Sequence, residues 1–161
     1  MSTTTHTSQT SQATHSTQST QSPSTLSVEQ VQKAFDHSTF IAWLGMRVTS
    51  LDHDAQVIEV EIPFQDAFER GKGTRQWHGG PLAAIIDTVG DFAVGMLVGR
   101  GLPTVNFRVD YLRPAIDTDL HAVARVRRLG KSIGVADVDL FNAKGALVAI
   151  GRASYATLPT N

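Results

Sequence analysis

The chain has 161 residues, of which 41% are hydrophobic and 18% are charged, so it is long and apolar enough for one domain with a packed core. Its formal net charge of −1 gives no electrostatic basis for nucleic acid or an anionic membrane surface as the main partner. The absence of cysteine excludes disulfides, thiolate zinc sites and a cysteine nucleophile. No apolar run is expected to approach the roughly 20 residues that span a bilayer.

Residues 1–25 differ in composition from the rest of the chain. They are almost all Ser, Thr, Gln and His, and the first formally charged residue is Glu29. A segment with so few apolar side chains cannot offset its ordering entropy, so we expect a disordered tail, followed by a single domain over 26–161. A tail that binds a partner or is modified is the alternative. Without the basic start and apolar stretch of a secretory signal, the expected location is the cytoplasm.

The domain begins with a predicted helix and two predicted strands. Ser27 followed three residues later by Gln30 is a capping-box pattern, and apolar residues recur at helical spacing as far as His37. Residues 46–52 and 55–62 are predicted strands, the second because apolar and acidic side chains alternate along it.

A loop and a long apolar helix follow. Residues 63–77 contain proline and glycine without periodicity and are predicted to form a loop. Pro81 suits a first helical turn, and the stretch from Leu82 to Val98 is apolar around nearly the full circumference of a helix. Such a helix must be buried on most sides, and Gly90 and Gly95 leave room for a close backbone approach.

The remainder of the chain contains strand patterns only. The predicted strands are 103–113, 119–129, 132–142 and 146–157. The short connections between them predict an antiparallel meander. One sheet wrapped around one buried helix is an α+β arrangement.

Asp87 is the polar exception in the most apolar part of the chain. Because an unpaired buried carboxylate costs several kcal/mol, it must be hydrogen-bonded, neutral or facing a cleft. A core aspartate that accepts a hydrogen bond from a backbone group is the structural alternative. Asp91 lies one turn later, nearer the helix end, and is expected to be more solvated.

The sequence His78-Gly79-Gly80 opens the same helix. The first amides of a helix have no internal partner and lie at its positive end, where they can hold a carbonyl oxygen that gains charge. A turn that requires glycine for steric reasons is the alternative. Gly79 and Asp87 lie eight positions apart, about 12 Å along a helix, so one reacting carbonyl cannot touch both. If both act, two chains must supply them, which predicts a homodimer with two equivalent interfacial sites.

Two further places carry candidate residues. Thr104 lies near the start of the first strand after the helix and can orient a water molecule, or it is simply a β-branched strand residue. Arg128, Lys131 and Ser132 cluster at one hairpin and can receive a phosphate-bearing ligand, or they are the solvated end of that hairpin. The histidines show no metal-ligand spacing, so no metal is predicted.

Three runs of residues form a recognisable combination: HGGPLAAIIDTVG, TVNFRVDYLRPA and ARVRRLGKSIGVADVDLFNAKGALVAIGRASY. Together they resemble the hotdog-fold acyl-CoA thioesterases, most closely the phenylacetic-acid-degradation branch of the 4-hydroxybenzoyl-CoA thioesterase superfamily. The resemblance spans about residues 36–157 and depends on HGG with an aspartate nine positions after the histidine, a strand ending in YLRPA, and an RxGKS hairpin. It implies a curved antiparallel sheet wrapped around a long central helix, and dimers with a continuous sheet, often paired as dimers of dimers.

The resemblance also implies roles for individual residues. Asp87 falls at the position of the catalytic carboxylate, and the Gly79 amide falls where the thioester carbonyl is polarised at the other chain's helix start. Thr104 falls where relatives position the attacking water, and His78 shapes the turn and the thioester end of the pocket. The substrate-binding positions, the last three beside the coenzyme A arm, are Gly80, Gln76, Arg128, Lys131 and Ser132.

One stretch departs from the family pattern. Many relatives carry an Asn or Gln a few residues before HGG that helps to orient the water or the thioester, whereas here Gln76 has a different spacing and Trp77 follows it. Either Gln76 substitutes for that residue, or the loop shapes a different acyl pocket with Trp77 on its wall. Five aromatic residues either favour an aromatic or medium acyl chain or belong to the core: Phe40, Trp43, Phe64, Phe68 and Trp77.

The implied reaction is hydrolysis of an acyl-CoA thioester to a free acid and coenzyme A, without a metal or redox cofactor. Asp87 acts either as a general base on water or as a nucleophile through a mixed anhydride. A non-catalytic acyl-CoA-binding protein on the same scaffold is the main alternative. A hydratase of this fold is disfavoured, because its aspartate pairs with a histidine about five residues downstream, whereas position 92 is Phe.

Overall fold

The first helix forms where the capping box predicts it. In the computed structural model, which describes Met1 and residues 25–159, α1 (Val28–His37) begins after Ser27. The Ser27 hydroxyl accepts a hydrogen bond from the Gln30 amide, and the Gln30 side chain accepts one from the Ser27 amide. A short helix that was not predicted, α2 (Thr39–Leu44), follows and ends at Gly45. The predicted tail lies almost entirely outside the described residues.

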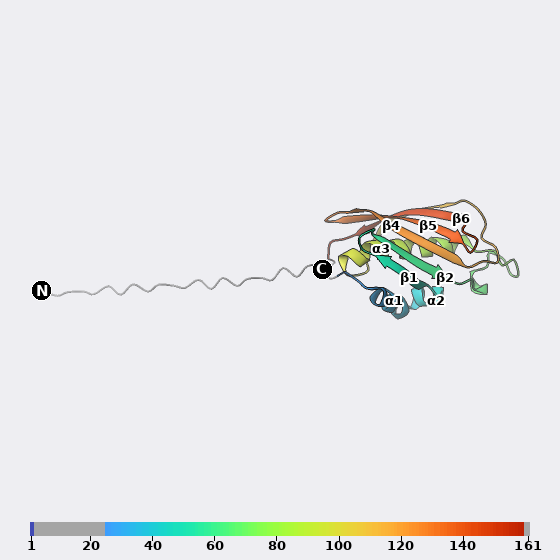
Figure 1. The fold of residues 1–161 in the computed structure, drawn as a ribbon, viewed down its shortest axis with the longest axis horizontal. Helices are drawn as coiled ribbons and strands as arrows, with labels where there is room; N and C mark the ends of the chain where they lie inside the picture. The colour runs from blue at the N-terminus through green and yellow to red at the C-terminus, as the bar shows by residue number, and fades with distance from the viewer. Residues whose placement is uncertain (2–24, 160–161) are drawn as a thin grey trace.

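Six strands form one antiparallel sheet, and each lies within two residues of its predicted range (Figure 1). Their order across the sheet is β1-β2-β4-β5-β6-β3. A single-turn 3-10 helix, η1 (Asp66–Phe68), interrupts the predicted loop after β2. The strand bounds are β1 Arg47–Asp52, β2 Val57–Ile62, β3 Thr104–Tyr111, β4 Leu120–Leu129, β5 Ile133–Asn142 and β6 Leu147–Ala156.

The predicted meander is correct for β4, β5 and β6 and wrong for β3. β3 does not pair with β4 but lies at the far edge beside β6, while β2 pairs with β4. The connection over 112–119 is eight residues long, enough for the chain to cross to the other edge instead of turning back as a tight hairpin. β3 is therefore an edge strand, and among the described residues only one of its sides is paired.

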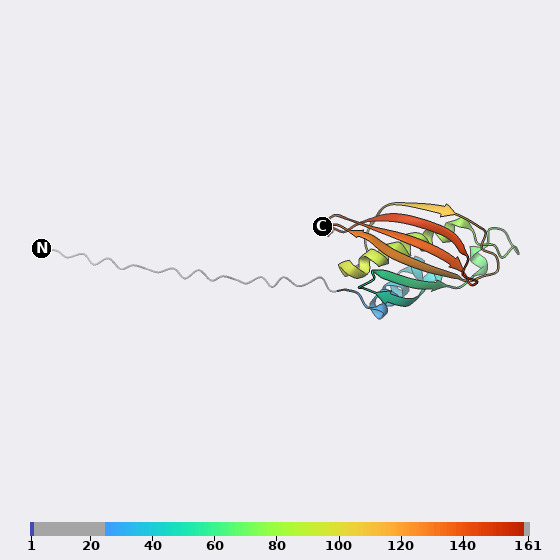
Figure 2. The same cartoon turned by 45° about the horizontal axis from the view of Figure 1, so that its top comes forward.

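The long helix α3 (Gly79–Val98) lies against the curved sheet, which arches over it in Figure 2. Glycine allows the close approach at both predicted positions. A methyl group at Gly90 would overlap the hydroxyl of Tyr155, and one at Gly95 would lie 2.5 Å from the carbonyl oxygen of Arg100. This sheet around a central helix confirms the predicted α+β hotdog arrangement.

The length and composition of α3 would also allow it to cross a bilayer, contrary to the expectation that no run approaches that length. The expectation was wrong because the helix stays as hydrophobic on average as a membrane-spanning helix, although it contains two aspartates. More than half of this stretch is buried inside the molecule, where it forms the middle of the core. The helix is thus explained by packing under the sheet.

Candidate active site

The start of α3 leaves one backbone amide open. His78 is the N-cap residue, and its Nδ1 accepts a hydrogen bond of 2.9 Å from the Gly80 amide. Pro81 has no N–H group to offer. The Gly79 amide donates to no residue that the structure describes, and it lies at the positive end of the helix. The structure thus places His78 in the turn, gives the Gly80 amide a partner, and leaves the Gly79 amide without one among the described residues.

Tyr111, at the end of β3, covers this helix start. Its hydroxyl donates a hydrogen bond of 2.9 Å to the Gly79 carbonyl oxygen, and a methyl group at Gly79 would lie 3.3 Å from its ring. Sequence reasoning missed Tyr111 as a site residue although it belongs to the YLRPA motif. Only the placement of β3 at the sheet edge brings its side chain to the helix.

A pocket of about 380 Å³ opens beside Gly79. Its walls come from the loop before α3, the first turn of α3 and the end of β3, and they include Gln76, Trp77, His78, Gly79 and Tyr111. Behind the pocket, the Trp77 ring stacks on the buried Phe68 ring at a centroid distance of 5.2 Å. Trp77 is therefore both a core residue and a pocket wall.

Asp87 and Thr104 meet at the other end of this arrangement. The Thr104 hydroxyl donates a hydrogen bond of 2.8 Å to Asp87 Oδ1. Asp87 is half-buried and Thr104 is exposed, so the pair lies at the open edge of the sheet and not in a sealed interior. The hydrogen-bond donor to the Asp87 carboxylate is thus a side chain. In the alternative of a core aspartate without a catalytic role, the donor would have been a backbone group.

A buried tyrosine fixes the backbone of this part of α3. The Tyr155 hydroxyl donates a hydrogen bond of 2.8 Å to the Asp87 carbonyl oxygen, and the Tyr155 side chain is fully buried. Burial raises the pKa of Tyr155, with smaller contributions from the charges of Asp87 and Asp91, so it stays a neutral donor. Asp87 is thereby anchored to β6.

Asp91 is not the solvated residue that the sequence predicts. It accepts a hydrogen bond of 2.7 Å from the Leu102 amide, because the segment after α3 folds back over it. The pKa of Asp91 is raised from 3.8 to about 7, mainly by burial and to a smaller extent by the neighbouring Asp87 charge, while the Leu102 hydrogen bond and the Arg100 charge lower it. The expectation was wrong because it considered only the position of Asp91 along the helix.

The two halves of the predicted site remain apart within one chain. Gly79 begins α3 and Asp87 lies two turns later, about 12 Å along the axis. Neither Asp87 nor Thr104 lines the pocket beside Gly79. The structure therefore brings together Asp87 with Thr104, and separately Gln76 with His78 and Gly79.

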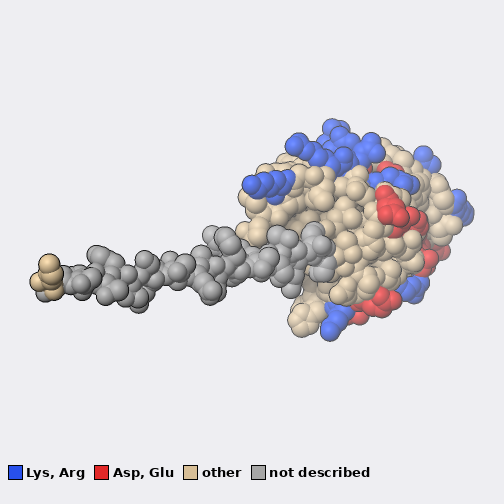
Figure 3. All heavy atoms as spheres, turned by 60° about the vertical axis from the view of Figure 1, so that its left-hand side comes forward, with Lys and Arg blue, Asp and Glu red and all other residues tan. Residues whose placement is uncertain are grey.

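The basic hairpin between β4 and β5 lies on the Thr104 side of the molecule. Gly134, just after the hairpin, pairs with Tyr155 on β6, and Tyr155 pairs with Thr104 on β3. Two strand spacings, about 10 Å, thus separate the hairpin end from Thr104. Arg128 and Lys131 are exposed, as is Ser132, and neither cation forms an ion pair with a described residue. Figure 3 shows a group of Lys and Arg side chains along the upper edge of that view, with others beside acidic residues at the right and bottom.

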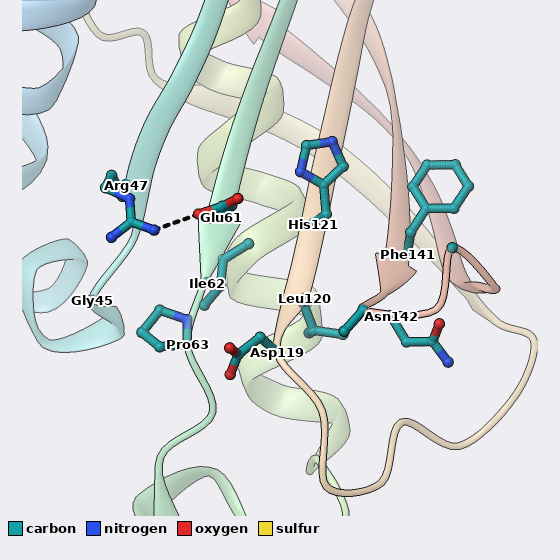
Figure 4. Close-up of a pocket in the computed structure, with 12 residues that line it drawn as sticks. Gly45, Arg47, Glu61, Ile62, Pro63, Asp119, Leu120, His121, Phe141 and Asn142 are labelled. Atoms are coloured by element: carbon teal, nitrogen blue, oxygen red, sulfur yellow. Dashed lines mark hydrogen bonds and ion pairs between the residues drawn. The ribbon is translucent and has the colours of Figure 1, made fainter.

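A second cavity lies on the outer face of the sheet and contains none of the predicted site residues (Figure 4). Glu61, His121 and Phe141 form one cross-strand row along its wall. Its polar groups already have partners: Arg47 pairs with Glu61, and His121 Nε2 lies 3.1 Å from a carboxylate oxygen of a neighbouring glutamate on β2. The candidate site is therefore the one built on α3 and β3.

Comparison with known proteins gives one consistent family. The model of the thioesterase superfamily matches residues 76–149, a range that contains every residue the sequence assigns to the site. The chain is 32% identical over 112 residues to the acyl-coenzyme A thioesterase PaaI of Escherichia coli, and this alignment covers 68% of this chain and 75% of that protein. It is 33% identical over 136 residues to a Halobacterium salinarum protein named as a proposed esterase, covering 78% of this chain and 88% of that protein. An X-ray structure of a protein from the thioesterase superfamily superposes with a TM-score of 0.76 at 35% identity, covering 80% of this chain and 96% of that one.

Proposed function

Since the chain belongs to the thioesterase superfamily and is a thioester hydrolase, we propose that it converts an acyl-CoA thioester and water to a free acid and coenzyme A. The observation that carries the proposal is the hydrogen bond from Thr104 to Asp87 at the open edge of the sheet. The likeness to the Escherichia coli acyl-coenzyme A thioesterase supports coenzyme A thioesters as the substrate class.

Asp87 and Thr104 are proposed to direct the attacking water. Thr104 donates its hydrogen to Oδ1, so Oδ2 and the hydroxyl lone pairs remain acceptors for a water molecule. Asp87 takes a proton as the water oxygen bonds to the thioester carbonyl carbon; the C–S bond then breaks and the thiolate leaves with that proton. In the alternative route, Asp87 itself bonds to the carbonyl carbon, the thiolate leaves, and water cleaves the mixed anhydride.

The Gly79 amide is proposed to stabilise the oxygen that becomes negative. It is an unoccupied donor at the positive end of a 20-residue helix, a setting in which one donor is worth on the order of 3 kcal/mol of transition-state stabilisation. His78 and Tyr111 hold the turn that carries it. The carbonyl oxygen must therefore sit beside the start of one α3, while its carbon faces Asp87.

Two chains are proposed to form each site, because Gly79 and Asp87 are too far apart in one chain. β3 supports this assembly: it is an edge strand, and three of its apolar side chains are exposed, Val105 by 59%, Phe107 by 40% and Tyr111 by 54%. An antiparallel pairing of two β3 strands would cover them and join the sheets around a two-fold axis. We also propose that such dimers pair into tetramers, which sedimentation tests. A cytoplasmic location is proposed as well, and localisation of the tagged chain tests it.

The hairpin is proposed to bind the phosphates of coenzyme A. Arg128 and Lys131 carry charges without a protein partner among the described residues, and Ser132 adds a hydroxyl beside them. By contrast, Arg127 lies 3.0 Å from Asp137 and is already neutralised. The hairpin and Thr104 lie toward the same end of the sheet, so one chain supplies both the phosphate contacts and the carboxylate.

Asp87→Asn tests the chemistry. Asparagine keeps an acceptor for the Thr104 hydroxyl but cannot take a proton, so kcat should fall about 10²- to 10⁴-fold with unaltered folding and assembly. Thiol release from a panel of aryl- and alkyl-CoA thioesters measures it. Undiminished turnover would remove Asp87 from the mechanism, and tight acyl-CoA binding by the wild type without thiol release would favour the non-catalytic binder. Transfer of oxygen-18 from labelled water into the Asp87 carboxylate during a single turnover would assign the nucleophilic route.

A mixed dimer tests the shared site. Gly79→Pro removes the amide hydrogen at a position whose backbone accepts proline, because proline suits the first helical position and His78 already has the extended ψ of 146° that a residue before proline prefers. Gly79→Ala keeps the amide hydrogen and controls for the added atoms, since a methyl group at Gly79 would lie 3.3 Å from the Tyr111 ring. Both the Gly79→Pro and the Asp87→Asn homodimers should be inactive. A purified dimer with one chain of each kind has one intact site of two, so it should recover about half of the wild-type turnover. A mixed dimer as inactive as its parents would place both groups in one chain.

A further inference from the structure

The chain between α3 and β3 is held by two aspartates one helical turn apart. α3 ends at Gly99, and the segment 99–103 folds back along the helix. The Leu102 amide donates to Asp91 Oδ1 at 2.7 Å, and two residues later the Thr104 hydroxyl donates to Asp87 Oδ1 at 2.8 Å. Two carboxylates on the same face of α3 thus accept hydrogen bonds from the returning chain.

We propose that Asp91 is a positioning residue for thioester hydrolysis, which holds the segment 99–103 against α3 and thereby places the Thr104 hydroxyl on Asp87. This inference rests on the function proposed for Asp87 and Thr104. Asp91 does not touch the reacting atoms, and its effect on catalysis passes through Thr104.

The sheet alone does not fix the direction of the Thr104 side chain. The ladder between β3 and β6 shifts its register between Thr104 and Asn106, so Thr104 lies beyond the regular part of the strand. On the sheet side, the Ala156 amide bonds the Pro103 carbonyl oxygen at 2.9 Å. On the helix side, the tie is the bond from Leu102 to Asp91. Thr104 is therefore located relative to both layers only when both bonds are present.

Gly101 of the returning segment lies beside the Asp91 carboxylate. A methyl group at Gly101 would lie 3.6 Å from Asp91 Oδ2, an ordinary contact distance. Burial holds the pKa of Asp91 near 7, which means that the charged form is kept at a cost in stability. A neutral Asn would accept the same amide hydrogen without that cost. The acceptor, and not the charge, is therefore the part that positions Thr104.

Three variants of the full chain test the proposal. Asp91→Ala removes the acceptor and should lower kcat about 10- to 100-fold with KM nearly unaltered, because the water is misplaced while the substrate still binds. Asp91→Asn keeps the acceptor and should retain kcat within about threefold. Asp52→Ala is the matched control: Asp52 Oδ1 also accepts a loop amide, that of Ala55 at 2.8 Å, but in a turn that carries no site residue.

Coupling to Thr104 separates positioning from general destabilisation. In a Thr104→Ala background, Asp91→Ala should produce no further loss of kcat, because the hydroxyl it places is already gone. A further loss of the same size in that background would overturn the proposal, and so would full activity of Asp91→Ala. If Thr104→Ala itself leaves kcat at the wild-type level, the function proposed for Thr104 fails instead. Melting temperatures of all variants show whether each is folded in the assay.

Discussion

Gly90→Ala tests how closely α3 packs against β6. The added methyl group would overlap the Tyr155 hydroxyl and lie 3.2 Å from Val138 Cγ2. Tyr155 has no room to withdraw, because its side chain is fully buried and its hydroxyl bonds the Asp87 carbonyl oxygen at 2.8 Å. Either the ring or the helix must therefore move, and the bond between them must lengthen or break.

The expected cost of Gly90→Ala follows from three effects. Overpacking a filled core costs about 1–3 kcal/mol, and loss of the hydrogen bond between Tyr155 and the Asp87 carbonyl costs about 1 kcal/mol more. Replacing glycine by alanine inside a helix stabilises the folded state by about 1 kcal/mol, which offsets part of this cost. The free energy of unfolding should fall by about 1–3 kcal/mol, which corresponds to a Tm lower by about 3–10 °C for a domain of this size. Urea unfolding and thermal melting measure both quantities.

A second substitution supplies the control. Tyr155→Phe removes the hydroxyl that the new methyl group would overlap, so Gly90→Ala should be less destabilising in that background, with a coupling of about 1 kcal/mol or more. A Gly90→Ala protein that is about 1 kcal/mol more stable than the wild type, as an ordinary helical Gly→Ala variant would be, would refute the packing argument. Equal effects of Gly90→Ala with and without the hydroxyl would do the same.

Three further predictions concern titration, assembly and substrate binding. Between pH 3.8, the ordinary pKa of an aspartate, and about pH 7, folded Asp91 keeps a proton that the unfolded chain has lost. The free energy of unfolding should therefore fall by about 1.4 kcal/mol per pH unit as the pH rises through this range. Urea unfolding at two pH values should show that Asp91→Asn removes this slope. Phe107→Glu, on the open edge strand, should yield folded but inactive monomers in sedimentation velocity, and an intact dimer would contradict the proposed interface. Arg128→Ala combined with Lys131→Ala should raise KM for acyl-CoA at least about tenfold but leave KM for the phosphate-free acyl-N-acetylcysteamine thioester as it was.

Most elements could be predicted because their signals are local. The Ser27 and Gln30 capping box fixes the start of α1, alternation marks β2, and the connections between strands mark the C-terminal ones. The helix α2 was missed because it has only six residues, too few for a helical period to show. The position of β3 was missed for another reason: strand pairing depends on contacts across the whole domain, and a connection of eight residues permits either edge.

The same distinction explains which site residues the sequence reveals. Asp87 is visible because it interrupts an apolar helix, and Gly79 because it lies in the glycine pair that opens this helix. The roles of Tyr111 and Asp91 cannot be predicted in this way, since Tyr111 reaches Gly79 from the edge strand and Asp91 accepts its hydrogen bond from the returning segment. Both contacts are made by residues distant in sequence or by a loop without a regular pattern. Their discovery needed the tertiary arrangement.

The distance between Gly79 and Asp87 along α3 suits a site that two chains share around a two-fold axis. Gly79, Ala83 and Asp87 recur at intervals of four and so lie along one face of α3. Ala83 is the midpoint, so in the proposed dimer an axis beside Ala83 would bring each Gly79 opposite the partner's Asp87, on both sides at once. Ala83 is only half-buried within its own chain, and its small side chain lets two helices approach closely. Because the open amide lies at the helix start and the Asp87 carboxylate two turns later, a single crossing of two such helices would complete both sites of the proposed dimer, and the proposed hydrolysis would then depend on assembly.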